Sequence, residues 1–219
     1  MGTGLAEWTL FGSGPVAVRS DVAFQRTDLG DGAWVDVARG ALSGCDELAD
    51  RLLRGVDWQH FRRWLYDRMV DEPRVSRFYS AADPLPDPGL ADFRTAMGGR
   101  YGVAFGAMGL NLYRDGRDSV AAHGDVDLRN RGETLVAILT LGAIRPFMLK
   151  PTGGGRSVDL HPASGDIIVM GGTCQRTWQH GVPKVSRPLG PRISASIRWA
   201  EGYREPGWRP RGRTPSGAR

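Results

Sequence analysis

His123 and Asp125 are separated by one residue in the stretch 111–130, and together they could bind a metal ion. In an extended segment, side chains two positions apart point to the same side, so both can reach one ion. His180, which follows the apolar run 166–172, offers a third ligand. Two histidines and one carboxylate leave coordination positions open, and this ligand set suits non-haem Fe(II). The H-x-D spacing alone is weak, because a chain with four histidines can place one beside an aspartate as a hydrogen-bonded surface pair.

Arg192 and Arg198 are six positions apart in the segment 192–200, which puts both on one face of a strand. Guanidinium groups that point into a protein interior are costly unless they pair with anions, and a dicarboxylate would pair with both. Asn111 and Tyr113 share a strand face in the same way and offer polar ends to the same ligand. Without the histidines, a surface strand that alternates Arg and Ser would explain the segment equally well.

The ordered set N-x-Y, H-x-D, H and R-x5-R resembles the AlkB family of Fe(II)- and 2-oxoglutarate-dependent dioxygenases. The phrases "NLYRDGRDSVAAHGD", "SGDIIVMGGTCQRTWQHGVPK" and "RISASIR" are similar to that family as well. "EPRVSRFY" resembles a segment that precedes the core in nucleic-acid-repair members. The resemblance spans residues 40–200 and is strongest after residue 100. It implies Fe(II) as the metal, with 2-oxoglutarate and O₂ as cosubstrates.

The resemblance also implies a role for each matching residue. The iron ligands, which form the catalytic centre, would be His123, Asp125 and His180. The 2-oxoglutarate ligands would be Asn111, Tyr113, Arg192 and Arg198, with Arg192 at the distal carboxylate and Arg198 nearer the metal.

Asp127 falls where such enzymes often place an acid that touches the damaged base, although a solvated loop acid explains it equally well. Leu128 stands where several relatives keep a second acid, so the base preference is open.

The activity implied by the resemblance is oxidative demethylation of N-alkylated bases in DNA, of the 1-methyladenine and 3-methylcytosine type, with release of succinate, CO₂ and formaldehyde. A base inside a duplex must be flipped out to reach buried iron, and an aromatic platform would help to hold it. Tyr79 is our predicted platform, with Phe78 and Trp58 as further candidates, and each of them also fits a core position. Arg74 is predicted to contact the substrate, and further candidates for phosphate contacts are Arg77, Arg114, Arg117, Arg129 and Arg131.

The elements that must position these residues change in character along the chain. Residues 42–56 are predicted to form a helix capped by Ser43 or Asp46, and residues 58–69 a second helical piece. Residues 71–99 are rich in proline and turns, with a short strand at 74–80. After residue 105, short strands punctuated by Gly, Pro or Asp are predicted at 105–113, 133–142, 145–151, 156–162, 166–172 and 192–200.

These elements predict an α+β chain whose core is a double-stranded β-helix (jelly roll), preceded by helices and a nucleotide-recognition lid. We expect a flexible extension at 1–16, one dioxygenase domain at 17–202 and a basic flexible tail at 203–219. Within the domain, the lid and helices occupy 40–105 and the jelly roll occupies 105–200.

The composition indicates the class of partner, the location of the protein and the state of its cysteines. The 219 residues carry a net charge of +5, with a pI of about 9.7 and mostly Arg as the basic residue. This balance fits a nucleic-acid partner, and a biased genome with a solvated surface explains it equally well. No apolar run approaches the roughly 20 residues of a membrane span, and no secretory signal is apparent, so we expect a cytoplasmic protein. Cys45 and Cys174 are expected to be reduced and structural, and the chain is expected to be a monomer.

Three readings besides DNA demethylation stay open at this point. The same chemistry could act on RNA or on a protein side chain. A noncatalytic nucleic-acid-binding module could have kept the fold, although no ligand position is damaged. A jelly roll that holds zinc or nickel for small-molecule chemistry is disfavoured by the Arg pair, which calls for a dicarboxylate.

Overall fold

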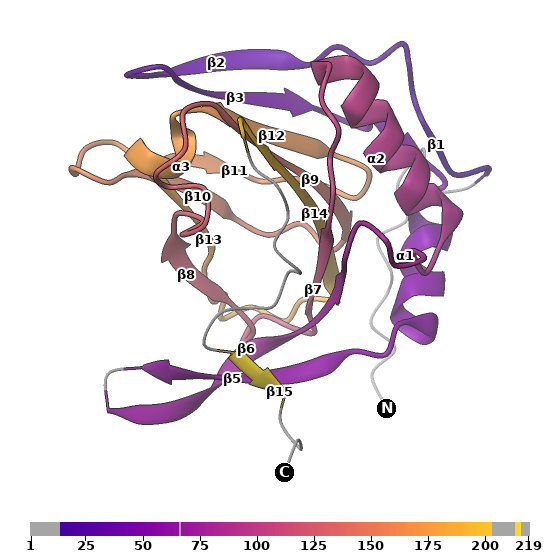
Figure 1. Ribbon diagram of the computed structural model, residues 1–219. Coiled ribbons are helices and arrows are strands. Elements are labelled where there is room, and N and C mark those ends of the chain that lie inside the picture. The colour runs from indigo at the N-terminus through magenta and orange to yellow at the C-terminus, as the bar shows by residue number, and fades with distance from the viewer. Residues whose placement is uncertain (1–13, 66, 203–212, 216–219) are drawn as a thin grey trace.

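Two antiparallel β-sheets face each other and two helices cover the outer side of the larger sheet, as the computed structural model shows (Figure 1). The structure describes residues 14–65, 67–202 and 213–215. The strands are β1 (Ala17–Val18), β2 (Gln25–Gly30), β3 (Ala33–Ala38), β4 (Leu42–Ser43), β5 (Gln59–Leu65), β6 (Arg68–Tyr79), β7 (Met108–Tyr113), β8 (Val120–His123), β9 (Thr134–Gly142), β10 (Phe147–Pro151), β11 (Val158–Leu160), β12 (Ile167–Gly172), β13 (Trp178–Val182), β14 (Arg192–Ala200) and β15 (Arg213–Pro215). The helices are α1 (Cys45–Gly55), α2 (Pro88–Tyr101) and the short α3 (Cys174–Thr177).

The larger sheet has the strand order β15-β5-β6-β7-β14-β9-β12-β3-β2, and the smaller one has the order β11-β10-β13-β8. Neighbours in the larger sheet such as β14 and β9 are far apart in sequence and pair over nine residues. Strands β1 and β4 form a separate two-stranded ribbon. Two facing sheets built by such crossovers are the predicted jelly roll, and the predicted strands after residue 105 lie within it.

Strand β9 shows why this part of the sequence is one apolar run. Leu135, Ala137 and Leu139 face the helices, whereas Val136 and Ile138 face the smaller sheet. Both faces of the strand are therefore buried, and the usual alternation with polar residues is lost. Alternate residues of β9 therefore pack either against the helices or into the core between the two sheets.

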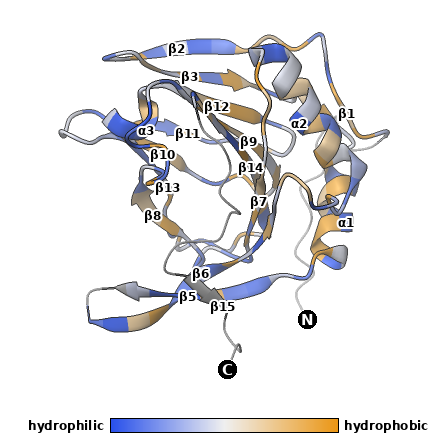
Figure 2. Ribbon diagram, viewed as in Figure 1, coloured by the Kyte–Doolittle hydropathy of each residue, from blue (hydrophilic) through white to orange (hydrophobic). Residues whose placement is uncertain are grey.

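Helices α1 and α2 pack on the larger sheet through apolar stripes. In α2, Leu90, Phe93 and Met97 are fully buried at helical spacing. Figure 2 shows these helices with apolar stretches, in contrast to the largely hydrophilic edge strand β2. Helix α1 begins later than predicted. Its N-cap is Gly44 in the left-handed region, without a side-chain cap, so the expected cap by Ser43 or Asp46 is wrong.

The predicted helix at 58–69 is also wrong, because this segment forms β5 and the start of β6. The spacing of Trp58, Phe61 and Leu65 suggested a helical face. In the structure only Phe61 among residues 59–64 is buried, while Trp64 is 66% exposed. Pairing of β5 with both β6 and β15 supplies its backbone hydrogen bonds, and this tertiary pairing overrides the local pattern.

The segment 71–99 is more regular than its prolines suggested. Strand β6 reaches back to Arg68, and helix α2 begins at Pro88. The Asp87 side chain accepts a hydrogen bond from the Gly89 amide at 2.9 Å and caps this helix, while proline at the first helical position is pre-organised for a helix start.

The two predicted flexible ends fall largely outside the described residues. Of the predicted tail, residues 213–215 form β15 against β5, so these three residues are not the flexible chain that was expected. Among the helices within the described ranges, none is long and apolar enough to cross a membrane.

Candidate active site

A cavity of about 660 Å³ opens between the two sheets. Its walls combine apolar side chains such as Val136, Ile138 and Phe147 with a concentrated set of charged and polar groups. Cavities of this size and mixed lining are typical of small-molecule sites. The polar lining includes Glu72, Arg74, Asn111, His123, Asp125, Asp127, His180, Ser194, Ser196 and Arg198.

His123, Asp125 and His180 converge in this cavity, with one ligand atom of each within 4.8 Å of the others. His123 ends β8 and pairs in register with His180 on β13, and their ring centroids are 4.5 Å apart. Asp125 lies just after β8, and its Oδ1 is 3.9 Å from His123 Nε2. The Nδ1 of His123 donates to the Ala121 carbonyl oxygen at 2.9 Å, which leaves Nε2 as the ligand atom facing the cavity.

Burial and charge set the protonation of this triad. Burial lowers the pKa of His180 to about 3, and His123 adds to the effect. Burial also lowers the pKa of His123. For Asp125, burial alone would raise the pKa, but Arg198 and His180 outweigh it and hold the pKa well below its usual range. Two neutral imidazoles beside an ionised carboxylate are the forms that bind a metal.

Asp125 is fixed in place by the protein on two sides. The Arg198 guanidinium donates to its two carboxylate oxygens, at 2.7 Å and 3.4 Å. The backbone amide of Asp125 donates to Gln175 Oε1 at 2.9 Å. Between the two ligands, Gly124 leaves no room for a side chain, since a Cβ there would lie 2.5 Å from the Gln175 carbonyl oxygen. The H-G-D sequence therefore depends on glycine for its close approach to α3.

A second group of predicted residues lies deeper, across strands β7 and β14. Arg192 pairs in register with Tyr113, and Ser194 with Asn111. Arg192 is fully buried, and its Nη2 donates to Thr140 Oγ1 at 3.3 Å. Its Nε and Nη1 have no hydrogen-bond partner within the described part of the chain. Burial lowers the pKa of Arg192 to about 10, and nearby Arg145 adds to this.

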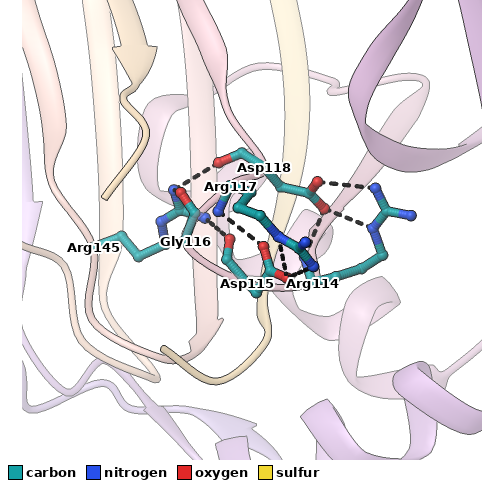
Figure 3. Close-up of polar contacts among 6 residues, drawn as sticks. All are labelled: Arg114, Asp115, Gly116, Arg117, Asp118 and Arg145. Carbon is teal, nitrogen blue, oxygen red and sulfur yellow. Dashed lines mark hydrogen bonds and ion pairs between the residues drawn. The ribbon is translucent and has the colours of Figure 1, made fainter. Parts of the chain in front are cut away.

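Arg145 anchors the loop between β7 and β8 and was not singled out from the sequence. Its fully buried guanidinium donates to the carbonyl oxygens of Asp115 and Asp118 (Figure 3) and to that of Pro183, at 2.7–2.8 Å. Its Cζ lies 5.3 Å from the Tyr113 ring centroid. The loop leads directly to the metal ligands, so Arg145 helps to hold Tyr113 and β8 in place. A lone arginine before a strand gives no sequence signal for this role.

The predicted phosphate contacts in the same loop are engaged within the protein. Arg114 donates to Asp118 through its backbone amide, Nε and Nη2, and Arg117 donates to Asp115 (Figure 3). Arg77 lies 3.5 Å from Asp57. Of the remaining candidates, Arg129 lines the cavity rim.

The predicted substrate residues divide between cavity and core. Arg74 and Asp127 line the cavity, with Asp127 exposed at its rim and Arg74 largely buried. Tyr79 and Trp58 pack instead against the core beneath the helices, so the structure does not bring Tyr79 to the cavity. Its neighbour Phe78 lines the cavity, because adjacent residues of β6 point to opposite faces.

Leu128 is buried in the core between the sheets rather than exposed at the rim. Cys174 is buried in the same cluster, and burial raises the pKa of its thiol to about 12, as suits a structural cysteine. Both cysteines are free thiols. His60 and His161 lie outside the set of residues that could share a metal.

The residues fit ferrous iron and a dicarboxylate. Two imidazoles and a carboxylate form the facial set preferred by non-haem Fe(II). The two orphan nitrogens of buried Arg192 call for an anion, because an uncompensated buried charge is costly.

Comparison with known proteins agrees with this geometry. Residues 68–204, well over half of the chain, match the family model of the 2OG-Fe(II) oxygenase superfamily. The chain is 27% identical over 177 residues to the alpha-ketoglutarate-dependent dioxygenase alkB homolog 3 of Bos taurus, which covers 72% of this chain and 62% of that protein. It is 26% identical over 119 residues to the DNA oxidative demethylase ALKBH2 of Homo sapiens, covering 51% of this chain and 46% of that protein. The chain thus aligns with less than two thirds of the length of these relatives.

A solved structure shares the fold. The prolyl hydroxylase of Trichoplax adhaerens, in complex with a hypoxia inducible factor peptide, superposes with a TM-score of 0.59 at 11% identity, over 77% of this chain and 84% of that one. This likeness confirms the double-stranded β-helix, and the family match confirms the dependence on Fe(II), 2-oxoglutarate and O₂. The chain belongs to the 2OG-Fe(II) oxygenase superfamily, and its similarity to alkB homolog 3 and ALKBH2 agrees with the predicted resemblance to the AlkB family.

Proposed function

We propose that this protein is an oxidative demethylase that repairs N-alkylated bases in DNA, of the 1-methyladenine and 3-methylcytosine type. The observation that carries the proposal is the convergence of His123, Asp125 and His180 in the cavity, together with a buried Arg192 whose Nε and Nη1 have no partner among the described residues. The names of the relatives, a dioxygenase and a DNA oxidative demethylase, support the reaction class and the substrate.

In this proposal His123, Asp125 and His180 hold Fe(II), which with 2-oxoglutarate and O₂ supplies hydroxylation of an N-linked methyl group, while the cosubstrate leaves as succinate and CO₂. The hydroxymethyl group then departs from the base as formaldehyde. Arg198 keeps Asp125 ionised and oriented through its two hydrogen bonds. Arg192 receives the distal carboxylate of 2-oxoglutarate, with Tyr113 and Asn111 beside it on β7.

The cavity is large enough for a flipped base above the cosubstrate. Phe78 and Phe147 line the cavity as apolar walls, and the partly exposed ring of Phe78 is our candidate for stacking against the base. Arg63 and Arg129 are part of the cavity lining. Their positive charges would attract the DNA phosphates that flank the lesion. The partner in this proposal is alkylated DNA, the protein is a cytoplasmic monomer, and RNA is the alternative substrate.

A noncatalytic binding module and a zinc or nickel enzyme both fit the site less well than an iron dioxygenase does. A noncatalytic module has no need of an intact metal set with neutral imidazoles. Small-molecule chemistry on zinc or nickel leaves Arg192 buried without an anion.

The test is a turnover assay of wild type and His123→Ala on oligonucleotides that carry one 1-methyladenine or 3-methylcytosine, in single- and double-stranded DNA and in RNA. We expect formaldehyde and succinate in equal amounts from wild type and neither from His123→Ala. His161→Ala, which alters a histidine outside the metal set, is the matched control and keeps full activity. Absence of turnover on every nucleic acid would refute the proposal, and turnover on RNA alone would redirect it.

A further inference from the structure

Glu72 is a buried carboxylate of the cavity lining that belongs neither to the metal set nor to the predicted cosubstrate ligands. It lies on β6, is 5% exposed and contributes to the cavity lining. Arg74 and Phe78, on the same strand and separated from it by even numbers of residues, line the cavity too. Strand β6 therefore presents an acidic, a basic and an aromatic side chain to one space.

The neighbours of Glu72 connect it to the rest of the site. Its Oε2 lies 3.2 Å from Arg74 Nη2. The Nε of Arg74 donates to Asn111 Oδ1 at 3.0 Å, and the Ser76 hydroxyl donates to the same oxygen at 2.9 Å. A carboxylate can accept several hydrogen bonds at once, so Glu72 can hold Arg74 and a ligand together.

The three carboxylates of the described cavity lining have different surroundings. Asp125 belongs to the metal set and is gripped by Arg198. Asp127 is exposed at the rim, where solvent screens its charge. Glu72 is buried, so its charge is screened less by solvent and acts more strongly on a bound ligand than a charge at the rim does. Burying an ion pair gives little or no net stability, so the position of Glu72 calls for a role beyond folding.

We propose that Glu72 is a specificity-determining residue, which favours positively charged alkylated bases by pairing with the base cation and accepting a hydrogen bond from its exocyclic amino group. This rests on the proposed function. Methylation at N1 of adenine or N3 of cytosine gives a cation with an amino group beside the methyl. 3-Methylthymine is neutral and carries a carbonyl oxygen at the corresponding position, which a carboxylate repels.

The experiment measures kcat/KM of wild type, Glu72→Gln and Glu72→Ala on single-stranded oligonucleotides with one 3-methylcytosine or one 3-methylthymine. Loss of one charge-assisted hydrogen bond lowers the value for 3-methylcytosine by about 10- to 100-fold in Glu72→Gln. The value for 3-methylthymine stays the same or rises. The ratio of the kcat/KM values for the two lesions, measured on one preparation of a variant, does not depend on the fraction of that variant that is folded.

Asp71→Asn is the matched control, because Asp71 is adjacent, 77% exposed on its side chain and paired with Arg62 outside the cavity. It leaves the ratio at the wild-type value. If Glu72 only supports Arg74 and Asn111, both lesions fall together and the ratio does not change, which would overturn this assignment while wild-type turnover still upholds the demethylase. If wild type acts on neither lesion, the proposed function fails and the role of Glu72 fails with it.

Discussion

We expect the substitution Arg192→Met to weaken 2-oxoglutarate binding and, at the same time, to raise the stability of the ligand-free protein. Arg192 is fully buried, and two of its nitrogens have no partner among the described residues. In our proposal these nitrogens would donate to the distal carboxylate of 2-oxoglutarate. Hydrogen bonds to charged groups contribute about 1.5–3 kcal/mol each, so two of them account for about 3–6 kcal/mol. We expect Arg192→Met to weaken 2-oxoglutarate binding by roughly 100- to 10,000-fold.

The same substitution should stabilise the protein without its ligand. An uncompensated buried guanidinium costs several kcal/mol, and Met fills much of the same space without a charge. The hydrogen bond to Thr140 is lost, which reduces the gain. We expect the free energy of unfolding to rise by about 1 kcal/mol or more, which for a chain of this size raises Tm by about 2–4 °C.

Two measurements on each variant check this reasoning. Calorimetric titration with 2-oxoglutarate, with Mn²⁺ in place of iron, gives the affinity, and thermal unfolding with and without 2-oxoglutarate gives the stability. Wild type gains stability as the cosubstrate saturates it, whereas Arg192→Met gains little. Arg187→Met, which alters an exposed arginine, is the matched control and changes neither quantity. An Arg192→Met protein that binds 2-oxoglutarate like wild type would refute the assignment, and one that unfolds several degrees earlier would refute the argument from uncompensated charge.

Three further predictions concern the framework of the site. Gly124→Ala places a methyl group 2.5 Å from the Gln175 carbonyl oxygen, so the neighbouring metal ligands must shift. Mn²⁺ affinity should therefore fall at least about tenfold in a calorimetric titration. Unchanged affinity would contradict the tight approach of Gly124 to α3. Asp118→Ala removes the buried acceptor of three hydrogen bonds from Arg114 and should lower the free energy of unfolding by about 2 kcal/mol in a urea titration. Burial raises the pKa of the Cys174 thiol to about 12, so iodoacetamide at pH 8 should modify it only after denaturation, and labelling of the native protein, read by peptide mass spectrometry, would count against its buried position.

The residues of the catalytic core could be predicted from the sequence because several of them lie close together, at spacings that a strand requires. His123 and Asp125 lie two positions apart, and the even spacing of Arg192 and Arg198 follows directly from the period of a strand. The pairing of His180 with His123 across β13 and β8 could be inferred only from the resemblance, since no local pattern encodes which strands are neighbours.

The pre-core segment was harder to predict because its pattern is ambiguous. Trp58, Phe61 and Leu65 are spaced as on a helix, yet the pairing of β5 with β6 makes this segment a strand. Likewise, Tyr79 was expected at the substrate and Phe78 occupies the cavity instead. A shift of one residue moves a strand side chain to the opposite face, and the face is fixed only by the neighbouring strand β7.

The two arginines of β14 illustrate how one spacing gives two roles. An even separation puts Arg192 and Arg198 on one face, but six residues of extended strand cover about 20 Å, so both guanidinium groups cannot grip one end of a small ligand. Arg198 is already committed to the metal ligand Asp125 at 2.7 Å. Arg192 is buried beside Thr140 and near Tyr113, which lines the cavity, and two of its nitrogens have no partner among the described residues. Strand β14 therefore supplies Arg198, which holds the carboxylate of Asp125, and Arg192, whose buried charge we propose is balanced when 2-oxoglutarate binds.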